Sequence, residues 1–364
     1  MLDKRPSVTA LKALRVTQKP ALTTVAEMVA AGLAAPETAA TLDRVADSFR
    51  LRLSPAMHAA IDPSDPADPI ARQFVPDARE LEVAETDLRD PIGDAVHSPT
   101  PGLTHRYPDR VILAATHTCE VYCRFCFRRE VVGDDGALPE AELDAAIAYL
   151  AATPQIWEVI LTGGDPFTLS PRRLAALITR LAAIPHIEVI RFHTRVPVVA
   201  PDRITSALIR ALKTRPVAYV VVHTNHANEL TQAAREALAR LADAGIPLLS
   251  QSVLLKGIND SVAALTDLFR TLIRARVKPY YLHHCDLARG ASHFRTTIAE
   301  GQALMAALRG ALSGTCLPTY VLDIPGGFGK VPIGPDYLAP TPTPGLYRVT
   351  DPGGTRHDYA DPAC

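Results

Sequence analysis

The sequence predicts an α/β fold in which parallel strands and helices alternate to form a partial barrel of the (β/α)6 type. Apolar, β-branched runs recur from residue 111 onward, and after the first they are spaced about 30 residues apart, the length of one strand–helix unit. Stretches rich in Ala and Leu at helical spacing fill the intervals between these runs. Regular alternation of this kind is typical of a parallel sheet covered by helices.

Individual elements follow from the same pattern. Helix-start residues such as Ser170, which precedes Pro171, and Thr231 support the predicted helices. Those helices cover residues 140–151, 171–183, 203–213, 229–244 and 261–274. The predicted strands begin near Val111, Trp157, Ile187, Val217, Ile246 and Val277, and a further strand covers residues 319–322.

The chain is predicted to have three parts, with the barrel core at residues 106–315. Residues 1–105 are expected to form an N-terminal helical arm and an extended, proline-marked connector, and the arm wraps the main domain or a partner subunit. Its helices are expected around residues 8–15, 22–34 and 37–53. Residues 316–364 supply a C-terminal strand, a glycine-rich loop that ends at Lys330, and a tail. No chemistry is assigned to the N-terminal arm.

Composition predicts an ordinary soluble protein of the cytoplasm. Hydrophobic residues make up 48% of the chain, and the formal net charge is -1 without a long basic run, so no nucleic-acid partner is expected. No apolar run approaches the roughly 20 residues that cross a bilayer, and residues 1–6 lack the apolar core of a signal peptide. Six cysteines, three of them clustered, fit metal binding in a reducing compartment better than a disulfide framework.

Cys119, Cys123 and Cys126 follow the first predicted strand on one short loop. Iron–sulfur clusters are usually held by four cysteines, so three thiolates would hold three irons of a cubane and leave the fourth iron open to a small molecule. A zinc loop without its fourth ligand and a chance grouping are the alternatives. The spacing, with Phe125 before the last cysteine, resembles that of the radical S-adenosylmethionine (SAM) enzymes.

Polar residues follow every predicted strand, at the end where the active sites of barrels gather. Gly163 and Gly164, before Asp165, let a ligand approach the backbone closely, although a simple strand-to-helix turn would also explain them. Lys330 ends a glycine-rich loop that is not a phosphate P-loop, because position 324 is Ile and position 331 is Val. A lysine there can form a Schiff base with pyridoxal phosphate (PLP), and an ordinary surface lysine is the alternative.

Several separate motifs together resemble the lysine 2,3-aminomutase family of PLP-dependent radical SAM enzymes. The resemblance covers about residues 65–340, and the motifs occur in order at residues 101–110, 119–129, 163–165, 251–255, 278–286 and 323–330. It implies that Cys119, Cys123 and Cys126 hold a 4Fe–4S cluster whose open iron binds SAM, and that Lys330 carries PLP. One-electron cleavage of SAM would then give a 5′-deoxyadenosyl radical that starts migration of an amino group from Cα to Cβ, with SAM regenerated. An electron donor such as flavodoxin or ferredoxin would be needed.

Further site residues are implied by their positions in these motifs. The resemblance implies that SAM is contacted by Gly163, Gly164, Asp165, His223 and Gln251. It implies that Arg110 binds PLP and that Arg128 binds the substrate carboxylate. It also implies that Asp286 and Asp323 bind the distal ammonium of the substrate. For His223 and Gln251 the alternative is that they only satisfy backbone groups at strand ends.

The two aspartates point to the substrate. A hydrogen bond to a charged group contributes roughly 1.5–3 kcal/mol, so two acids favour a cationic side chain, and glutamate-acting relatives replace them. The predicted reaction is conversion of L-lysine to β-lysine. Another cationic amino acid such as arginine is the first alternative, and a non-catalytic metal-binding protein on the same barrel is the second.

The tail departs from part of the family. The lysine-fermentation enzymes carry a C-terminal cysteine cluster that binds a structural zinc, whereas this tail holds a single cysteine, Cys364. Zinc, and the homo-oligomer that zinc supports, are therefore in doubt. The compact length resembles the branch that makes β-lysine for modifying translation elongation factor P.

Overall fold

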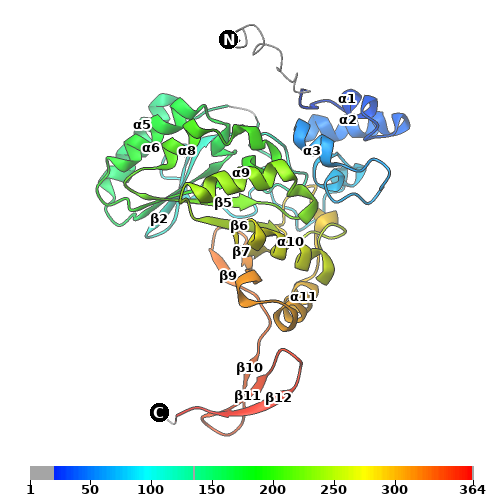
Figure 1. Ribbon diagram of the computed structural model, residues 1–364, viewed down its shortest axis with the longest axis vertical. Coiled ribbons are helices and arrows are strands. Elements are labelled where there is room, and N and C mark those ends of the chain that lie inside the picture. Colours follow the sequence, from blue (N-terminus) through cyan, green and yellow to red (C-terminus); the bar gives the residue numbers. More distant parts are fainter. Residues whose placement is uncertain (1–19, 134–135, 363–364) are drawn as a thin grey trace, which may run out of the picture.

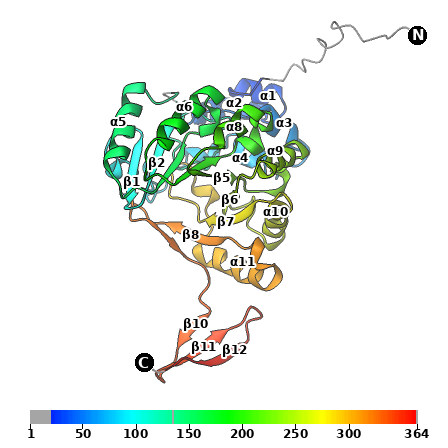
Figure 2. The ribbon, with the colours of Figure 1, turned by 60° about the vertical axis from the view of Figure 1, so that its left-hand side comes forward.

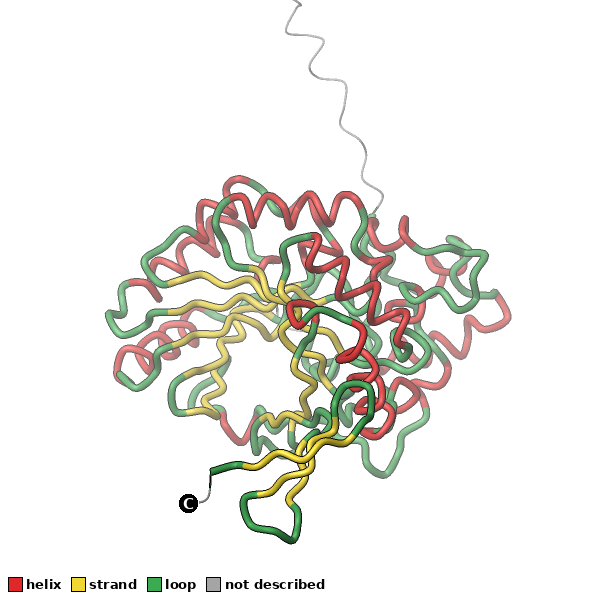
Figure 3. The backbone as a smooth tube through the Cα atoms, turned by 60° about the horizontal axis from the view of Figure 1, so that its bottom comes forward, coloured by secondary structure: helices red, strands yellow, loops and turns green. Residues whose placement is uncertain are grey.

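A curled sheet of nine strands forms the centre of the computed structural model, which describes residues 20–133 and 136–362. The strands lie side by side in chain order, and β2 to β8 run parallel to one another. Viewed from below in Figure 3, the sheet bends round on itself while the helices stay outside it. The strands are β1 Leu103–Tyr107, β2 Arg110–Thr116, β3 Glu158–Gly163, β4 Val189–Thr194, β5 Val217–His223, β6 Leu248–Val253, β7 Lys278–His283, β8 Thr319–Asp323 and β9 Lys330–Pro332.

Helices connect the parallel strands and pack their apolar faces against the sheet (Figure 1). Helix α6 shows why: Ser170 caps its start, Pro171 begins it, and its leucines at helical spacing are buried. The helices of this part are α5 Glu140–Ala152, α6 Pro171–Ala182, α7 Val196–Val199, α8 Ser206–Leu212, α9 Gln232–Asp243, α10 Val262–Arg274 and α11 Ile298–Ala311.

The prediction of an α/β partial barrel is confirmed, and each predicted strand start lies close to an observed one. Two helices of the barrel begin three residues later than predicted. Helix α8 begins at Ser206 rather than 203, and α9 at Gln232 rather than 229, because Thr205 and Thr231 cap them from an extended or irregular backbone. The segments just before these caps form short 3-10 turns.

Both edge strands of the sheet, β1 and β9, differ from the prediction, which placed no strand at either position. Strand β1 pairs antiparallel with β2, and β9 pairs antiparallel with β8, where Lys330 lies opposite Asp323. The two edges are joined by one hydrogen bond, because the Tyr107 hydroxyl on β1 accepts from the backbone N–H of Lys330 on β9 at 2.8 Å. This contact fixes the position of Lys330 at the seam of the barrel.

The N-terminal part packs on the barrel and shares its hydrophobic core, to which Met28, Leu53 and Phe74 contribute fully buried side chains. Its helices are α1 Val25–Ala30, α2 Ala39–Ser48, α3 Pro55–Ala60 and α4 Ala71–Phe74. The predicted helix over 37–53 is too long, since Phe49 turns extended and Leu53 pairs with Leu22 in a β-bridge. The helix predicted at 8–15 lies outside the described residues. The predicted domain boundaries at 105 and 315 stay a prediction.

The C-terminal residues, predicted only as a tail, form a second sheet. Its strands are β10 Leu338–Pro340, β11 Leu346–Thr350 and β12 Arg356–Ala360, paired antiparallel in that order. Figures 1 and 2 show this sheet projecting below the barrel. Within the part of the chain that the structure describes, no helix has the length and apolar character needed to span a membrane.

Candidate active site

One large cavity occupies the interior of the curled sheet and has a volume of about 990 Å³. It extends from the loop that carries Cys119 to the amino ends of strands, where Trp157 and Val217 line it. Every residue that the sequence analysis assigned to the site lines this cavity, including all three cysteines, Arg110, Arg128 and Lys330. The fold therefore collects residues more than 200 positions apart into one site.

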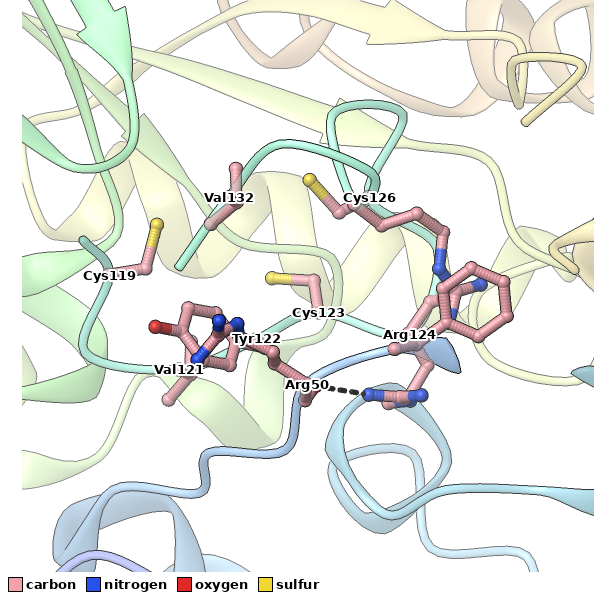
Figure 4. Close-up of a pocket in the computed structure, with 10 residues that line it drawn as sticks. Arg50, Cys119, Val121, Tyr122, Cys123, Arg124, Cys126 and Val132 are labelled. Atoms are coloured by element: carbon pink, nitrogen blue, oxygen red, sulfur yellow. Dashed lines mark hydrogen bonds between the residues drawn. The ribbon is translucent and has the colours of Figure 1, made fainter. Parts of the chain in front are cut away.

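The three cysteines lie together on the loop after β2. Figure 4 shows their thiols around a smaller pocket that Phe49 and Arg50 also line. Burial raises the pKa of Cys126 to about 11 and raises the pKa of Cys119 well above its usual range. In this surrounding the thiolate form needs a positive partner, which iron ions would provide.

The cysteines suit a cluster better than a single ion. Among the described residues, no group of three or more His, Cys, Asp or Glu side chains converges on one point as the ligands of one metal ion would. Each thiolate of a cubane binds a different iron, so its three thiols need only share a pocket. The three cysteines border the same two pockets, and we conclude that this loop fits a 4Fe–4S cluster.

A buried ion-pair group holds the cysteine loop in place. The guanidinium of Arg124, between two of the cysteines, donates to both carboxylate oxygens of Glu80, with a closest contact of 2.6 Å. Arg129 also pairs with Glu80. The side chains of Glu80, Arg124 and Arg129 are 0%, 2% and 5% exposed. The N-terminal part, to which the sequence assigned no chemistry, thus anchors the loop.

A second buried group reaches the middle cysteine itself. Arg195, which follows β4, donates from Nη1 to the Sγ atom of Cys123 at 2.8 Å and from Nη2 to Glu229 at 2.6 Å. Gln73 accepts a further hydrogen bond from Arg195 Nη2 at 3.0 Å. Arg195 therefore ties the Cys123 thiol to the buried acid Glu229 and helps to hold the middle of the cysteine loop in place.

Gly163 and Gly164 are required by packing within the protein. An added Cβ at Gly163 would lie 2.5 Å from the Cβ of Ala114, and one at Gly164 would lie 2.5 Å from the carbonyl oxygen of Thr118. Gly163 also has a φ of +96°, which favours glycine. The close approach is therefore to β2 and the cysteine loop, and contact with SAM stays a prediction.

Asp165 also has a structural explanation. Its carboxylate accepts from the Thr194 hydroxyl at 2.7 Å and from the backbone N–H groups of Phe167, Arg195 and Val196 at 3.0, 2.7 and 3.2 Å. Burial raises the pKa of Asp165 despite these donors. Its carboxylate ties the end of β3 to the end of β4, and its predicted role in cofactor binding stays a prediction.

Side chains from five neighbouring strands form a row of hydrogen bonds across the cavity. His223 Nε2 lies 3.1 Å from Gln251 Oε1, and Gln251 Nε2 lies 2.6 Å from His283 Nε2. His283 Nδ1 lies 3.0 Å from Asp323 Oδ2, and the Lys330 ammonium donates to the same Asp323 oxygen at 2.6 Å. The residues predicted to contact SAM are thus connected to the lysine predicted to carry PLP.

The two predicted substrate aspartates differ in their electrostatics. Burial, together with the charge of Asp323, raises the pKa of Asp286 to about 7. Burial alone would also raise the pKa of Asp323, but hydrogen bonds from His283 and Lys330, together with the charge of Lys330, hold that pKa below its usual range. Burial lowers the pKa of Lys330, against the attraction of Asp323. Asp323 is therefore the stronger acid of the two, and Asp286 titrates near neutral pH.

Arg128 is already paired in this structure. Its Nε and Nη2 atoms donate to Asp94 Oδ2 at 2.9 and 2.8 Å, and Arg106 pairs with the other oxygen of Asp94 at 3.1 Å. A guanidinium carries five N–H donors, so this pairing leaves donors for a substrate carboxylate. Asp94 was not assigned a role from the sequence.

Arg110 and Lys330 share a corner of the cavity through Tyr107. The Arg110 guanidinium lies 3.8 Å from the centre of the Tyr107 ring, while the Tyr107 hydroxyl bonds the Lys330 backbone. Arg110 also pairs with Asp109 at 2.7 Å and is partly exposed. An amine for the aldehyde of PLP and a guanidinium for its phosphate are thus available on one side of the cavity, and these residues fit PLP.

Several neighbours of the site had no role assigned from the sequence, among them Asp94, Tyr107, Arg195 and His283. Arg195 and His283 lie in the polar strand ends that the sequence analysis singled out, so position along the strand was an available signal. Asp94 and Tyr107 precede the first parallel strand, where no periodicity marks them, although Tyr107 lies within the motif at residues 101–110.

Comparisons with known proteins agree with this geometry. Residues 113–269 match the family model described as "Radical SAM superfamily", and residues 305–343 match the model described as "Lysine-2,3-aminomutase". The cysteine loop and the cavity therefore belong to a radical SAM enzyme. A protein of Clostridium subterminale named "L-lysine 2,3-aminomutase" is 46% identical over 80% of this chain and 70% of its own length. The chain belongs to the lysine 2,3-aminomutase family and is an isomerase.

Two further relatives show how wide the family is. A protein of Escherichia coli (strain K12) named "L-lysine 2,3-aminomutase" is 37% identical over 78% of this chain and 83% of its own length. One of Clostridioides difficile (strain 630) named "Glutamate 2,3-aminomutase" is 39% identical over 82% of this chain and 70% of its own length. Membership in the family implies a 4Fe–4S cluster, SAM and PLP as cofactors. Overall identity does not separate the two substrates, so the site residues must.

Proposed function

We propose that this protein converts L-lysine to β-lysine by moving the amino group from Cα to Cβ. The observation that carries the proposal is the pair Asp286 and Asp323, which line the same cavity as Lys330 and the three cysteines. Two acids in a partly buried site attract an ammonium and repel a side-chain carboxylate. This favours lysine over glutamate, and four similar proteins, 42–46% identical to this chain, are named "L-lysine 2,3-aminomutase".

When bound, the cluster with SAM supplies a carbon radical that removes hydrogen from the substrate, and PLP supports the migrating amino group. The protein's own residues bind and orient. Lys330 provides the amine that attaches PLP, and Arg110 provides a guanidinium suited to its phosphate. Arg128 presents donors to the substrate carboxylate beside its pair with Asp94. Asp286 and Asp323 hold the distal ammonium, and this fixes the distance from the ammonium to the reacting carbons.

The ammonium of free Lys330 and the distal ammonium of the substrate would compete for the same oxygen of Asp323. The Lys330 ammonium occupies Asp323 Oδ2 in this structure, and the distal ammonium of the substrate is expected to use the same carboxylate. The charge of Lys330 also acts on Asp286, whose pKa it lowers against the effect of burial. When Lys330 is free, two ammonium groups are therefore present in the cavity, and both aspartates are needed to pair with them.

We further propose that the enzyme is cytoplasmic. Its electron would come from a small donor protein such as flavodoxin or ferredoxin. A SAM-derived radical requires one electron per activation, which such a donor would supply to the cluster. The oligomeric state and the use of β-lysine on elongation factor P stay predictions.

The test is anaerobic reconstitution with iron, sulfide, SAM, PLP, a chemical reductant and L-lysine, followed by chromatography of the amino acids. β-Lysine is the expected product, and L-arginine and L-glutamate serve as competing substrates in the same assay. Failure to form β-lysine by protein that is shown to contain both cluster and PLP contradicts the proposal. If the enzyme converts arginine in preference to lysine, then arginine is the substrate.

A further inference from the structure

His283 is the junction of the row of side chains that crosses the cavity. Its Nε2 faces Gln251 at 2.6 Å, on the side of the predicted SAM contacts, and its Nδ1 faces Asp323 at 3.0 Å. The same Nδ1 lies 3.1 Å from the Lys330 ammonium. The ring is buried. The family motifs predicted no role for His283.

The two contacts of Nδ1 require opposite protonation. A carboxylate oxygen only accepts, so Nδ1 must carry the proton when it bonds Asp323. An ammonium only donates, so Nδ1 must be bare when it bonds Lys330. A neutral imidazole has one protonated and one bare nitrogen, and burial, with the charge of Lys330, lowers the pKa of His283 and keeps the ring neutral. The ring therefore has two alternative states.

Each state dictates the direction of the rest of the row. With Nδ1 protonated, bare Nε2 accepts from the Gln251 amide nitrogen, and Gln251 Oε1 accepts from His223. With Nδ1 bare, Nε2 carries the proton and needs an acceptor, so the Gln251 amide must turn over and present its oxygen. Its nitrogen then faces His223, which must accept. Burial lowers the pKa of His223 to about 3, so that ring is neutral too and can take either form.

We propose that His283 is a positioning residue that transmits the state of the Lys330 amine to Gln251 and His223. A free Lys330 ammonium can donate to Nδ1, whereas Lys330 attached to PLP no longer presents an ammonium there, and Nδ1 then donates to Asp323. Attachment and release of PLP at Lys330 thereby change the donors and acceptors presented at the far side of the cavity. The inference rests on the proposed function, because it takes Lys330 as the PLP lysine and Gln251 and His223 as SAM contacts.

The experiment measures SAM binding rather than turnover. Protein with a reconstituted cluster is titrated with SAM, and the dissociation constant is read from the change in the EPR spectrum of the reduced cluster. It is measured with PLP-free and PLP-loaded wild type, and with Lys330→Ala without PLP. Coupling between sites typically amounts to about fivefold or more in affinity. We expect a change of that size between PLP-free and PLP-loaded wild type, and we expect Lys330→Ala to resemble the PLP-loaded form.

Two substitutions cut the row at different links. In His283→Asn, the shorter side chain keeps a donor near the position of Nδ1 but does not reach Gln251. In His283→Gln, the side chain reaches Gln251 but no longer contacts Asp323 and Lys330. Either variant should remove the effect of Lys330→Ala on SAM affinity while cluster content is retained. The matched control is His284→Asn, because His284 is next in sequence but bonds the Tyr320 hydroxyl at 2.8 Å. The control should preserve the full effect.

The outcomes separate this inference from the proposed function. Equal SAM affinity in PLP-free wild type, PLP-loaded wild type and Lys330→Ala overturns the inference. So does an undiminished effect of Lys330→Ala with His283→Asn or His283→Gln in place, and either folded variant suffices. Failure to convert lysine would sink the proposed function, yet the SAM titration could still be performed on the same protein.

Discussion

Asp286→Asn tests the electrostatic basis of substrate choice. The substitution keeps the size of the side chain and removes the negative charge of a carboxyl group whose pKa burial raises to about 7. The distal ammonium of lysine has a pKa of about 10.4 and stays positive across the range of interest. Attraction between the two is therefore present above pH 7 and is lost as the pH falls and Asp286 takes up a proton.

The size of the effect follows from these values. A hydrogen bond to a charged group contributes about 1.5–3 kcal/mol, so Asp286→Asn should lower kcat/KM for lysine about 10- to 100-fold at pH 8. With a pKa of about 7, roughly one tenth of Asp286 is ionised at pH 6. The wild-type kcat/KM should thus fall about tenfold from pH 8 to pH 6 through this group, and the variant should lose that dependence.

The assay is β-lysine formation at a series of pH values and lysine concentrations, because kcat/KM reports the ionisation of the free enzyme. Asp267→Asn, on the exposed face of α10, removes an acid outside the cavity and should keep the wild-type profile. If Asp286→Asn still shows the wild-type fall toward pH 6, another group causes it. The assignment of Asp286 to the distal ammonium would then be wrong.

Three further substitutions test other parts of the site. Lys330→Ala should abolish the absorbance of bound PLP and leave the iron content unchanged, and retained PLP absorbance would move the attachment to another lysine. Glu80→Gln should destabilise the protein by about 3–5 kcal/mol in urea unfolding, because it leaves the buried guanidiniums of Arg124 and Arg129 without a counter-charge; a change below about 1 kcal/mol would refute this. Gly164→Ala should lower cluster content, since its Cβ would lie 2.5 Å from the backbone oxygen of Thr118, whereas Gly314→Ala, with open space around it, should not.

The periodic part of the fold could be predicted from the sequence because each unit buries one apolar face. Strands such as β5 and helices such as α6 carry apolar runs or helical spacing that local pattern reveals. The edge strands β1 and β9 are short and only partly buried, so no pattern marks them. Their pairing is decided by the neighbours β2 and β8, which lie elsewhere in the chain.

The members of the site could be named from the sequence, but their partners could not. The cysteine spacing, Lys330 and the aspartates Asp286 and Asp323 stand out by residue type and by position after strands. The partners Glu80, Asp94 and Glu229 look like ordinary surface acids in the sequence. Only the structure shows that each is paired to an arginine at the site.

By itself, the sequence determined the α/β architecture, the cysteine loop and the family, because periodicity and motif spacing are local properties of the chain. The tertiary structure decided which atoms face one another. Hydrogen bonds and pKa values depend on burial and on neighbours within a few ångströms, and these neighbours come from strands far apart in sequence. That is why the row from His223 through His283 to Lys330 became visible only in the folded chain.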